Sequence, residues 1–296
     1  MTFEDNASIQ PLVSIIVPTR NSERYLSSCL QSIRDQNYPN VELIVVDRYS
    51  IDTTVAIAEA FGAKLLFTGP ERSAQINAGA RASNGQLLFR VDSDFRLEPT
   101  VVSECVNLVA GGADAVVVHN TAIDIGWLSR IRKFEVDMYK FSLDHSAARF
   151  ISKSAFLAIG GYAEDITAGE DYDFQNRITL SGFETFFCNA EAIHLDEPTH
   201  LSPVLRKYFQ YGRDFPKYRR QNLERSQIQL AFFRKDFFKH RKRLLERPMM
   251  TMGLIAYHSL KYAAGGIGYL SALIWRPESE ELVAETSDAG GSANEI

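Results

Sequence analysis

Two carboxylates separated by one residue, Asp92 and Asp94, directly follow an apolar run over 87–91. Hard oxygen ligands at this spacing suit Mg²⁺ or Mn²⁺, and such an ion neutralises the phosphates of a nucleotide. A bound ion also acts as a Lewis acid toward a departing diphosphate. An Asp-x-Asp triplet is common by chance, however, and in isolation it indicates only a solvated turn. The position of the triplet in the chain therefore decides its meaning.

A second group of polar side chains follows much later in the chain. Glu170 and Asp171 open a helical pattern. A carboxylate within hydrogen-bond reach of a hydroxyl can remove its proton, although acids also favour the first turn of a helix, and both roles can coexist. His194 ends the next apolar run, with Asp196, Glu197 and His200 close by. It is either a metal ligand or a structural histidine, and the sequence leaves both open.

The elements that must position these residues alternate through the first third of the chain. Strands are predicted at 13–17, 41–46, 64–67 and 86–91, with helices at 22–34, 52–60 and 73–82 between them. Continuously apolar strands that alternate with helices predict a parallel α/β sheet covered on both faces. Ligands bind such sheets beyond the carboxyl ends of the strands, which is where Asp92 and Asp94 lie.

The alternation is less regular after residue 95. Helices are predicted at 100–109, 125–141 and 171–180, and strands at 113–119, 150–152 and 185–194. The pattern is helical and basic from 201 to 247, and apolar over 249–275. The tail has six acids and no Lys or Arg, which predicts disorder. We therefore expect an α/β domain over 1–200, a helical region over 201–276 and an acidic tail over 277–296.

Composition indicates a globular chain with an uneven charge. Of its 296 residues, 45% are hydrophobic and 23% charged, which excludes disorder as the main state. The formal charge is −5, yet residues 206–247 hold 14 Lys/Arg and four Asp/Glu, a local charge of +10. This asymmetry indicates an anionic partner, either a membrane surface or phosphates. Cys29, Cys105 and Cys188 are expected to be buried and reduced, and the N-terminus shows no secretory signal, so we expect a cytoplasmic protein.

The order of motifs from about residue 12 to 197 resembles family 2 of the glycosyltransferases, which have the nucleotide-sugar-binding GT-A fold. The motifs are Pro18-Thr19-Arg20-Asn21, Asp47 with Ser50-Ile51-Asp52, Asn77-Ala78-Gly79, Gly85, Asp92-Ser93-Asp94, Gly160-Gly161-Tyr162 and Glu170-Asp171. The resemblance implies an inverting, metal-dependent enzyme that transfers a sugar from a nucleotide-sugar donor. The chain departs from the family at Arg48 and Tyr49, which puts recognition of the nucleotide base in doubt.

The same resemblance assigns a role to each motif residue. Asp47 would contact the base or ribose, in a pocket lined by Pro18, Thr19 and Asn21, and Asn77 belongs to a donor-side motif. Asp92 would lie near the ribose and diphosphate, and Asp94 would bind Mn²⁺ or Mg²⁺, with Asp92 and His194 as further candidate ligands. Asp171 would be the general base, and Glu170 would hold the acceptor. Ile76 stands where the family often has Arg, and Arg72 could supply the missing charge.

The C-terminal region predicts contact with a membrane. Aromatic and basic residues alternate over 205–220 and 232–239, which suits the headgroup layer of an anionic membrane. The alternative is a solvated basic face over an aromatic core. Nucleic acid is disfavoured, because no recognised fold for it accompanies the mixture. The run 249–275 exceeds the ~20 apolar residues of a span. Because His258 and Lys261 interrupt it, we favour an in-plane or re-entrant segment over a single span.

These observations predict an acceptor linked to lipid, either a phosphate or a glycan, at the cytoplasmic face of the membrane. A nucleotidyltransferase of similar fold is one alternative, but such enzymes usually have a Gly-rich phosphate loop after the first strand, where this chain has Pro18-Thr19-Arg20-Asn21. A catalytically silent, membrane-associated protein that binds nucleotide sugars is the other alternative. The intact Asp92, Asp94 and Asp171 argue against it.

Overall fold

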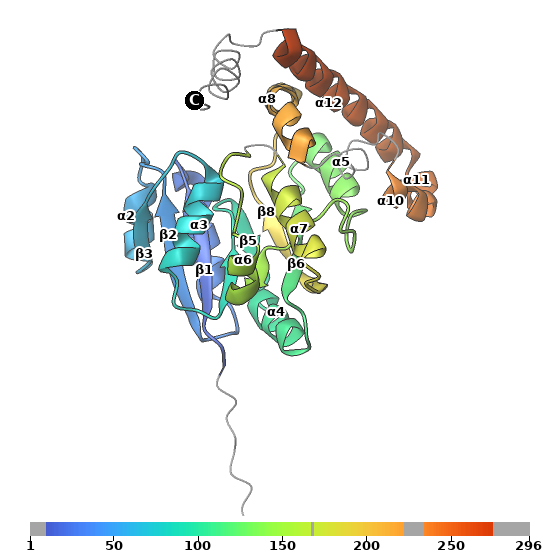
Figure 1. The fold of residues 1–296 in the computed structure, drawn as a ribbon. Coiled ribbons are helices and arrows are strands. Elements are labelled where there is room, and N and C mark those ends of the chain that lie inside the picture. Colours follow the sequence, from blue (N-terminus) through green and yellow to red (C-terminus); the bar gives the residue numbers. More distant parts are fainter. Residues whose placement is uncertain (1–9, 167–168, 222–233, 275–296) are drawn as a thin grey trace, which may run out of the picture.

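One eight-stranded sheet lies at the centre of the computed structural model, which describes residues 10–166, 169–221 and 234–274 (Figure 1). The strand order is β3-β2-β1-β4-β7-β6-β8-β5. The strands are β1 Val13–Thr19, β2 Val41–Asp47, β3 Lys64–Phe67, β4 Leu87–Arg90, β5 Phe95–Leu97, β6 Ala115–Ala122, β7 Phe150–Ser152 and β8 Thr185–His194. The predicted tail over 277–296 and the part of the basic region over 222–233 lie outside the described residues.

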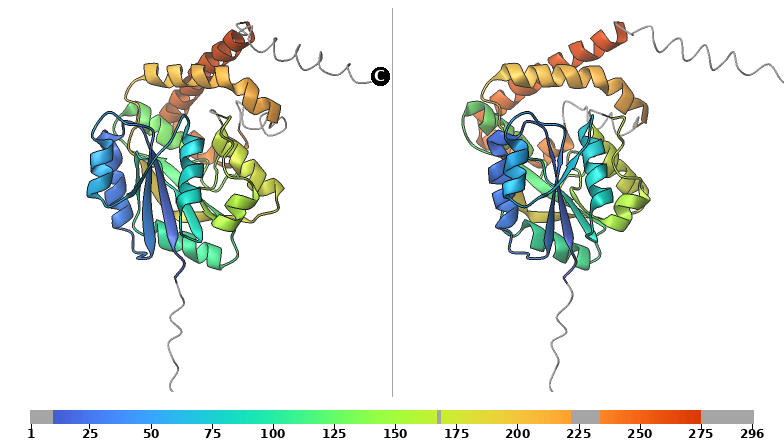
Figure 2. Two further views of the ribbon diagram at one scale, coloured as in Figure 1. Left: turned by 60° about the vertical axis from the view of Figure 1, so that its left-hand side comes forward. Right: turned by 90° about the vertical axis from the view of Figure 1, so that its left-hand side faces the viewer.

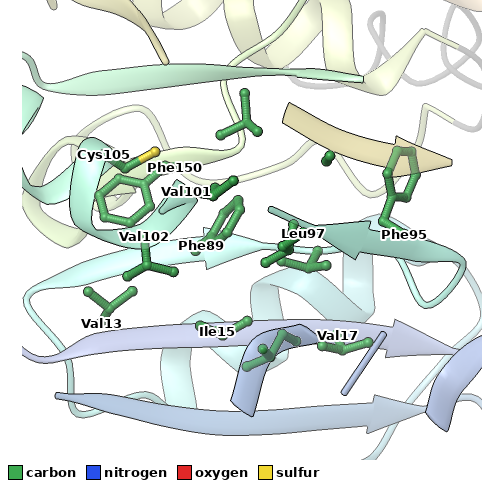
Figure 3. Packing of buried hydrophobic residues seen from close by; sticks show 14 of the residues in the cluster. Val13, Ile15, Val17, Phe89, Phe95, Leu97, Val101, Val102, Cys105 and Phe150 are labelled. Atoms are coloured by element: carbon green, nitrogen blue, oxygen red, sulfur yellow. The ribbon is translucent and has the colours of Figure 1, made fainter. Parts of the chain in front are cut away.

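The N-terminal half of the sheet is parallel, as predicted. β1 pairs in parallel with β2 and β4, and β2 pairs in parallel with β3. All seven residues of β1 are buried. Val13, Ile15 and Val17 pack on one face of the sheet (Figure 3), and Ile16 packs on the other. This is the alternation expected of a strand covered on both faces.

The C-terminal half of the sheet adds antiparallel pairs to the predicted parallel sheet, and four of the seven strand pairs are parallel. β7 is antiparallel to both β4 and β6, and β5 is antiparallel to β8, so that only β6 and β8 pair in parallel here. The sheet is therefore mixed. The sequence analysis did not predict β5, which has only three residues. Its register places Phe95 opposite His194, at the point where the chain turns after Asp94.

Helices cover both faces of the sheet. One core contains residues of α1 (Glu23–Arg34), α2 (Thr54–Ala60) and α4 (Val101–Ala110). The other contains residues of α3 (Arg72–Ala82), α6 (Lys153–Ala158) and α7 (Glu170–Leu180). The three cysteines are buried and free, which confirms the expectation for them.

The C-terminal helices form a separate layer around α5 (Trp127–Val136). They are α8 (Leu201–Gln221), α10 (Lys235–Lys239), α11 (Arg241–Glu246) and α12 (Pro248–Ile274). α8 and α12 lie beyond the edge of the sheet where β1 and β2 end (Figures 1 and 2). A small third core joins α5 to both of them. Among the described residues, no helix combines the length and apolarity that crossing a membrane requires.

Glycines allow α8 and α12 to cross at backbone contact. A Cβ on Gly212 would stand 2.0 Å from the carbonyl oxygen of Gly265, and a Cβ on Gly268 would stand 2.0 Å from that of Phe209. Gly266, in contrast, has nothing within 4 Å of its Cβ position. The close crossing thus depends on the absence of side chains at Gly212 and Gly268.

We predict opposite effects of the same substitution at two neighbouring glycines. Gly268→Ala should destabilise the protein by about 1–3 kcal/mol, because the new methyl forces the two helices apart. Gly266→Ala, the matched control, should stabilise it by up to about 1 kcal/mol, because alanine favours a helix and the space is open. Urea unfolding of both variants measures the difference. Equal effects would refute the close crossing.

Candidate active site

The acidic motifs meet at the carboxyl end of β4. Asp92 lies two residues after the end of that strand, and Glu170 and Asp171 lie in the first turn of α7. α7 begins after Gly169, whose φ of 87° lies in the left-handed region that glycine tolerates. Acids at this helix start are favoured by the helix dipole as well, so both roles considered for Glu170 and Asp171 are compatible with the structure.

The guanidinium of Arg90, the last residue of β4, joins these motifs. It donates to both carboxylate oxygens of Asp171, and its Nη2 lies 3.2 Å from one oxygen of Asp92. Only 3% of the Arg90 side chain is exposed. The ring of Tyr162 lies beside the guanidinium, and its hydroxyl accepts a hydrogen bond of 3.2 Å. Arg90 is therefore a buried cation held between two carboxylates.

Two further arginines converge on the same acids. Arg149 Nη1 lies 3.0 Å from Asp92, and its guanidinium stacks on the ring of Phe95. Arg72, at the start of α3, donates to Glu170 and lies 3.5 Å from Asp92 and 3.7 Å from Asp171. With 41% of its side chain exposed, Arg72 is the most accessible of the three arginines.

These cations change the acidity of both aspartates. Burial alone would raise the pKa of Asp171, but the charges of Arg90 and Arg72 outweigh it and lower the pKa to about 2. Burial opposes ionisation of Asp92 as well, yet Arg90 and Arg149 hold its pKa far below the usual range. Both side chains are therefore carboxylates at neutral pH.

Asp94 has a different partner from Asp92. Its Oδ2 lies 3.2 Å from His194 Nε2, at the end of β8, and the other ring nitrogen of His194 lies 2.7 Å from Glu197. Glu197 is buried and also pairs with Arg132 of α5 at 3.1 Å. Burial lowers the pKa of His194, but the hydrogen bonds to the two carboxylates outweigh it and raise the pKa to about 9.

This arrangement fits one side of a divalent-metal site. Two cis ligands of an octahedral Mg²⁺ at 2.0–2.1 Å would be about 3 Å apart, close to the observed separation of Asp94 and His194. A carboxylate on the second ring nitrogen, as Glu197 provides, is the usual partner of a metal-binding histidine. Over the described residues, however, no three His, Cys, Asp or Glu side chains are arranged so that together they could hold a metal ion. The metal role predicted for Asp92 stays a prediction, since its oxygens face arginines.

The donor-side motif residues organise the loops after β1 and β2. Asp47 is fully buried and accepts hydrogen bonds from Thr19 and from the backbone and hydroxyl of Ser50. Asn21 adopts a φ of 48° and bonds through its backbone to Ser50 and through its side chain to Ile51. Pro18 is buried in β1. Contact of these four predicted residues with a nucleotide stays a prediction.

Asn77 connects α3 to the Gly-Gly-Tyr turn instead of facing Asp92. Its amide donates to the carbonyl of Tyr162 and to Glu164, and its oxygen accepts from the backbone of Tyr162. A Cβ on Gly161 would stand 2.5 Å from that oxygen, which explains the glycine. Tyr162 in turn stacks on Phe174 of α7, with 4.1 Å between ring centroids. Asn77 thus positions Tyr162, which supports Arg90.

Three residues of this site were missed by the sequence analysis. Arg90 stands two residues before Asp92, on the same face of an extended segment, and a charged residue in an apolar strand was the available signal. Glu197 was noted only as a neighbour of His194. Nothing in the sequence indicates that Arg149 belongs to the site, because it lies just before β7, far in sequence from Asp92.

We predict that Arg90→Leu destabilises the fold by about 3–5 kcal/mol at pH 7, because it leaves the buried carboxylate of Asp92 and the half-buried carboxylate of Asp171 with less compensation. In the wild type, the low pKa of Asp171 contributes stability that is present above about pH 4 and is lost as pH falls toward 2. In the variant that pKa rises, so the penalty should shrink between pH 7 and pH 4.5. Urea unfolding at both pH values measures this.

Arg96→Leu is the control for this prediction, since Arg96 is exposed on the neighbouring β5. It should change stability by less than about 0.5 kcal/mol. A penalty for Arg90→Leu that is equally small would show that the buried ion pairs contribute nothing to the fold.

Comparison with known proteins now gives the family. Residues 14–160 match the Glycosyl transferase family 2 model. EpsH of Bacillus subtilis is 29% identical over 118 residues, 38% of this chain and 34% of that protein, so the chain matches only about a third of that relative. The succinoglycan biosynthesis protein ExoA of Rhizobium meliloti is 22% identical over 244 residues, 73% of this chain and 74% of that protein.

The fold has a solved counterpart. The mannosyltransferase PcManGT from Pyrobaculum calidifontis, solved with GDP-Man and Mn²⁺, superposes with a TM-score of 0.58 at 16% identity, over 95% of this chain and 81% of that chain. This likeness confirms a GT-A-like α/β fold. The family match and the order of motifs lead to one conclusion: the chain belongs to glycosyltransferase family 2.

Proposed function

We propose that this protein transfers a sugar from a nucleotide-sugar donor to an acceptor hydroxyl, with inversion at the anomeric carbon. One observation carries the proposal: the motifs from distant parts of the sequence meet around Asp92, Asp94 and Asp171 at the carboxyl end of β4. This is where α/β sheets bind ligands. The related mannosyltransferase was solved with a nucleotide sugar and Mn²⁺, which supports the same substrate class here.

The diphosphate of the donor would lie beside Asp94, His194 and Arg72. Asp94 and His194 would hold Mn²⁺ or Mg²⁺, and a bound ion would neutralise charge on the diphosphate. Glu197 fixes the orientation of the His194 ring, so that Nε2 faces Asp94. Arg72 is half-exposed and can donate two parallel hydrogen bonds to a phosphate.

Asp171 would act on the acceptor. In a single displacement the acceptor oxygen bonds to the anomeric carbon while the bond to the diphosphate breaks, and Asp171 takes the hydroxyl proton. A carboxylate with a pKa of about 2 is a weak base, because Arg90 and Arg72 stabilise its charged form. A donor diphosphate that engages Arg72 would weaken that hold and raise the basicity of Asp171. Base activation would thus follow donor binding.

We also propose that the acceptor is linked to lipid and presented at the cytoplasmic face of a membrane. Nine Lys or Arg residues are exposed in the described parts of α8, α10 and α11 and the residue that follows α11: Arg206, Lys207, Arg213, Arg219, Lys235, Lys239, Arg241, Lys242 and Arg247. Glu246 is the exposed acid in the same described parts. A surface of this charge attracts anionic headgroups.

Turnover of a panel of nucleotide sugars, with Mn²⁺ or Mg²⁺ and a membrane extract, tests the activity. We expect one donor to be used, and Asp94→Ala to reduce its turnover about 100-fold or more, since a metal contributes several kcal/mol. Asp196→Ala is the control: its exposed side chain lies two residues from His194, and turnover should stay within about twofold. Metal-dependent nucleotide binding without turnover of any donor would favour a silent binding protein.

The Asp171→Asn variant distinguishes loss of the general base from loss of donor binding. Transfer to the acceptor should fall by about 10²–10⁴-fold, because proton removal is lost, while the Kd of the nucleotide should change little. The anomeric configuration of the wild-type product, determined by NMR, should be the opposite of that in the donor. A product with the donor configuration would exclude the single displacement.

A further inference from the structure

α12 is apolar on both its inward and its outward face, and its only Lys and only His lie on the inward face. Its inward face carries Leu254 and Tyr257, but also His258 and Lys261, each 4% exposed or less. Both side chains reach Glu135 of α5: the Lys261 ammonium lies 2.9 Å and 3.0 Å from the two carboxylate oxygens, and His258 Nε2 lies 2.9 Å from one of them. His258 and Lys261, the two residues that interrupt the apolar run, therefore face the protein interior and contact Glu135 there.

The outward face of α12 is mostly apolar, with Ser259 as an exposed polar residue beside it. An apolar stripe runs along it, formed by Met249, Met252, Leu260, Ile267, Leu270 and Ile274, all of them exposed. At 100° per residue these six side chains fall within an arc of about 80°, opposite the inward face. The exposed fraction is 72% at Met249 and 83% at Ile274. The helix contains no acid, and its one Lys is turned inward.

A stripe of this length is unusual on a protein surface in water. The 27 residues of α12 extend about 40 Å at 1.5 Å per residue. Exposed apolar areas of this extent mark contact with a partner or a membrane. An apolar stripe along one side of a long helix suits the surface layer of a membrane, where a helix can lie in the plane of the bilayer.

We propose that α12 lies in the plane of an anionic bilayer, with its apolar stripe in the acyl boundary and the body of the protein in water. The link between this membrane contact and a lipid-linked acceptor rests on the proposed function, whereas the membrane contact itself does not.

Charge complementarity selects lipid over a second copy of the chain. The exposed basic residues of α8 and α11 lie on helices that contact α12, and those of α10 lie on the short helix that contacts α11. Two copies that paired through the stripe would bring these like charges together. An anionic bilayer would instead attract them, while the apolar stripe enters the acyl boundary. Phe238 and Leu245, 62% and 79% exposed on α10 and α11, add apolar contacts next to the basic residues.

The position of α12 also suits the reaction. α8 and α12 lie beyond the edge of the sheet where β1 and β2 end, the edge at which the acidic motifs meet (Figure 2). A bilayer that carries α12 would therefore lie at the same end of the sheet as the acidic motifs. A headgroup-linked acceptor would approach Asp171 from that end.

Flotation of the full chain with vesicles tests the proposal. The wild type should float with vesicles of phosphatidylcholine and phosphatidylglycerol, and less with phosphatidylcholine alone. Ile267→Glu with Leu270→Glu should reduce the partition coefficient about 10-fold or more, because two apolar side chains no longer enter the lipid. Leu157→Glu with Leu180→Glu is the matched control, since both leucines are exposed far from α12, at 57% and 86%. This pair should float like the wild type.

Two results would overturn the proposal. One is equal flotation of the stripe variant and the wild type. The other is self-association of the wild type, seen in sedimentation and abolished in the stripe variant, without vesicle binding. Turnover of a soluble nucleotide sugar is measured in parallel. A chain that floats but uses no donor would refute the proposed function and leave the membrane inference standing.

Discussion

The buried guanidinium of Arg90 is the constraint on which the site depends. It connects the end of β4 to the first turn of α7, two segments that lie 80 residues apart, through Asp92 and Asp171. Arg90 donates a hydrogen bond to the hydroxyl of Tyr162, and Asn77 accepts one from the backbone of Tyr162. Several motifs that look independent in sequence are thus parts of one supporting network around a single cation.

The same cation limits the chemistry. A guanidinium that stabilises the Asp171 carboxylate makes it easy to ionise and weak as a base, so the site has to loosen that pair before a hydroxyl can lose its proton. Of the three arginines, Arg72 is the one that a solvent-borne anion can reach, and it contacts Asp92, Glu170 and Asp171 together. Competition between donor and acids for Arg72 would order the two substrates.

Sequence reasoning succeeded where the pattern is local. The regular alternation of apolar strands and helices up to β4 placed the acidic triplet correctly, because parallel strands share one carboxyl edge. It missed β5, whose three residues carry too little periodicity. It located β7 but not its antiparallel pairing, because the direction of pairing is decided by the tertiary fold. The Arg149–Asp92 contact joins distant segments, and only the tertiary fold reveals it. Lys261 could not be assigned either, because its partner Glu135 lies 126 residues earlier.

α5 contacts both the residues beside the proposed metal site and the helix that we place at the membrane. Within one turn of this helix, Arg132 binds Glu197, which orients His194 toward Asp94, and Glu135 binds Lys261 of the helix that bears the apolar stripe. Buried ion pairs of this kind tolerate little displacement, since separating them exposes uncompensated charge. A shift of α12 that moves α5 would therefore change the position of the His194 ring. α5 therefore holds both α12, which we place at the membrane, and, through Glu197, His194, which we place beside the diphosphate.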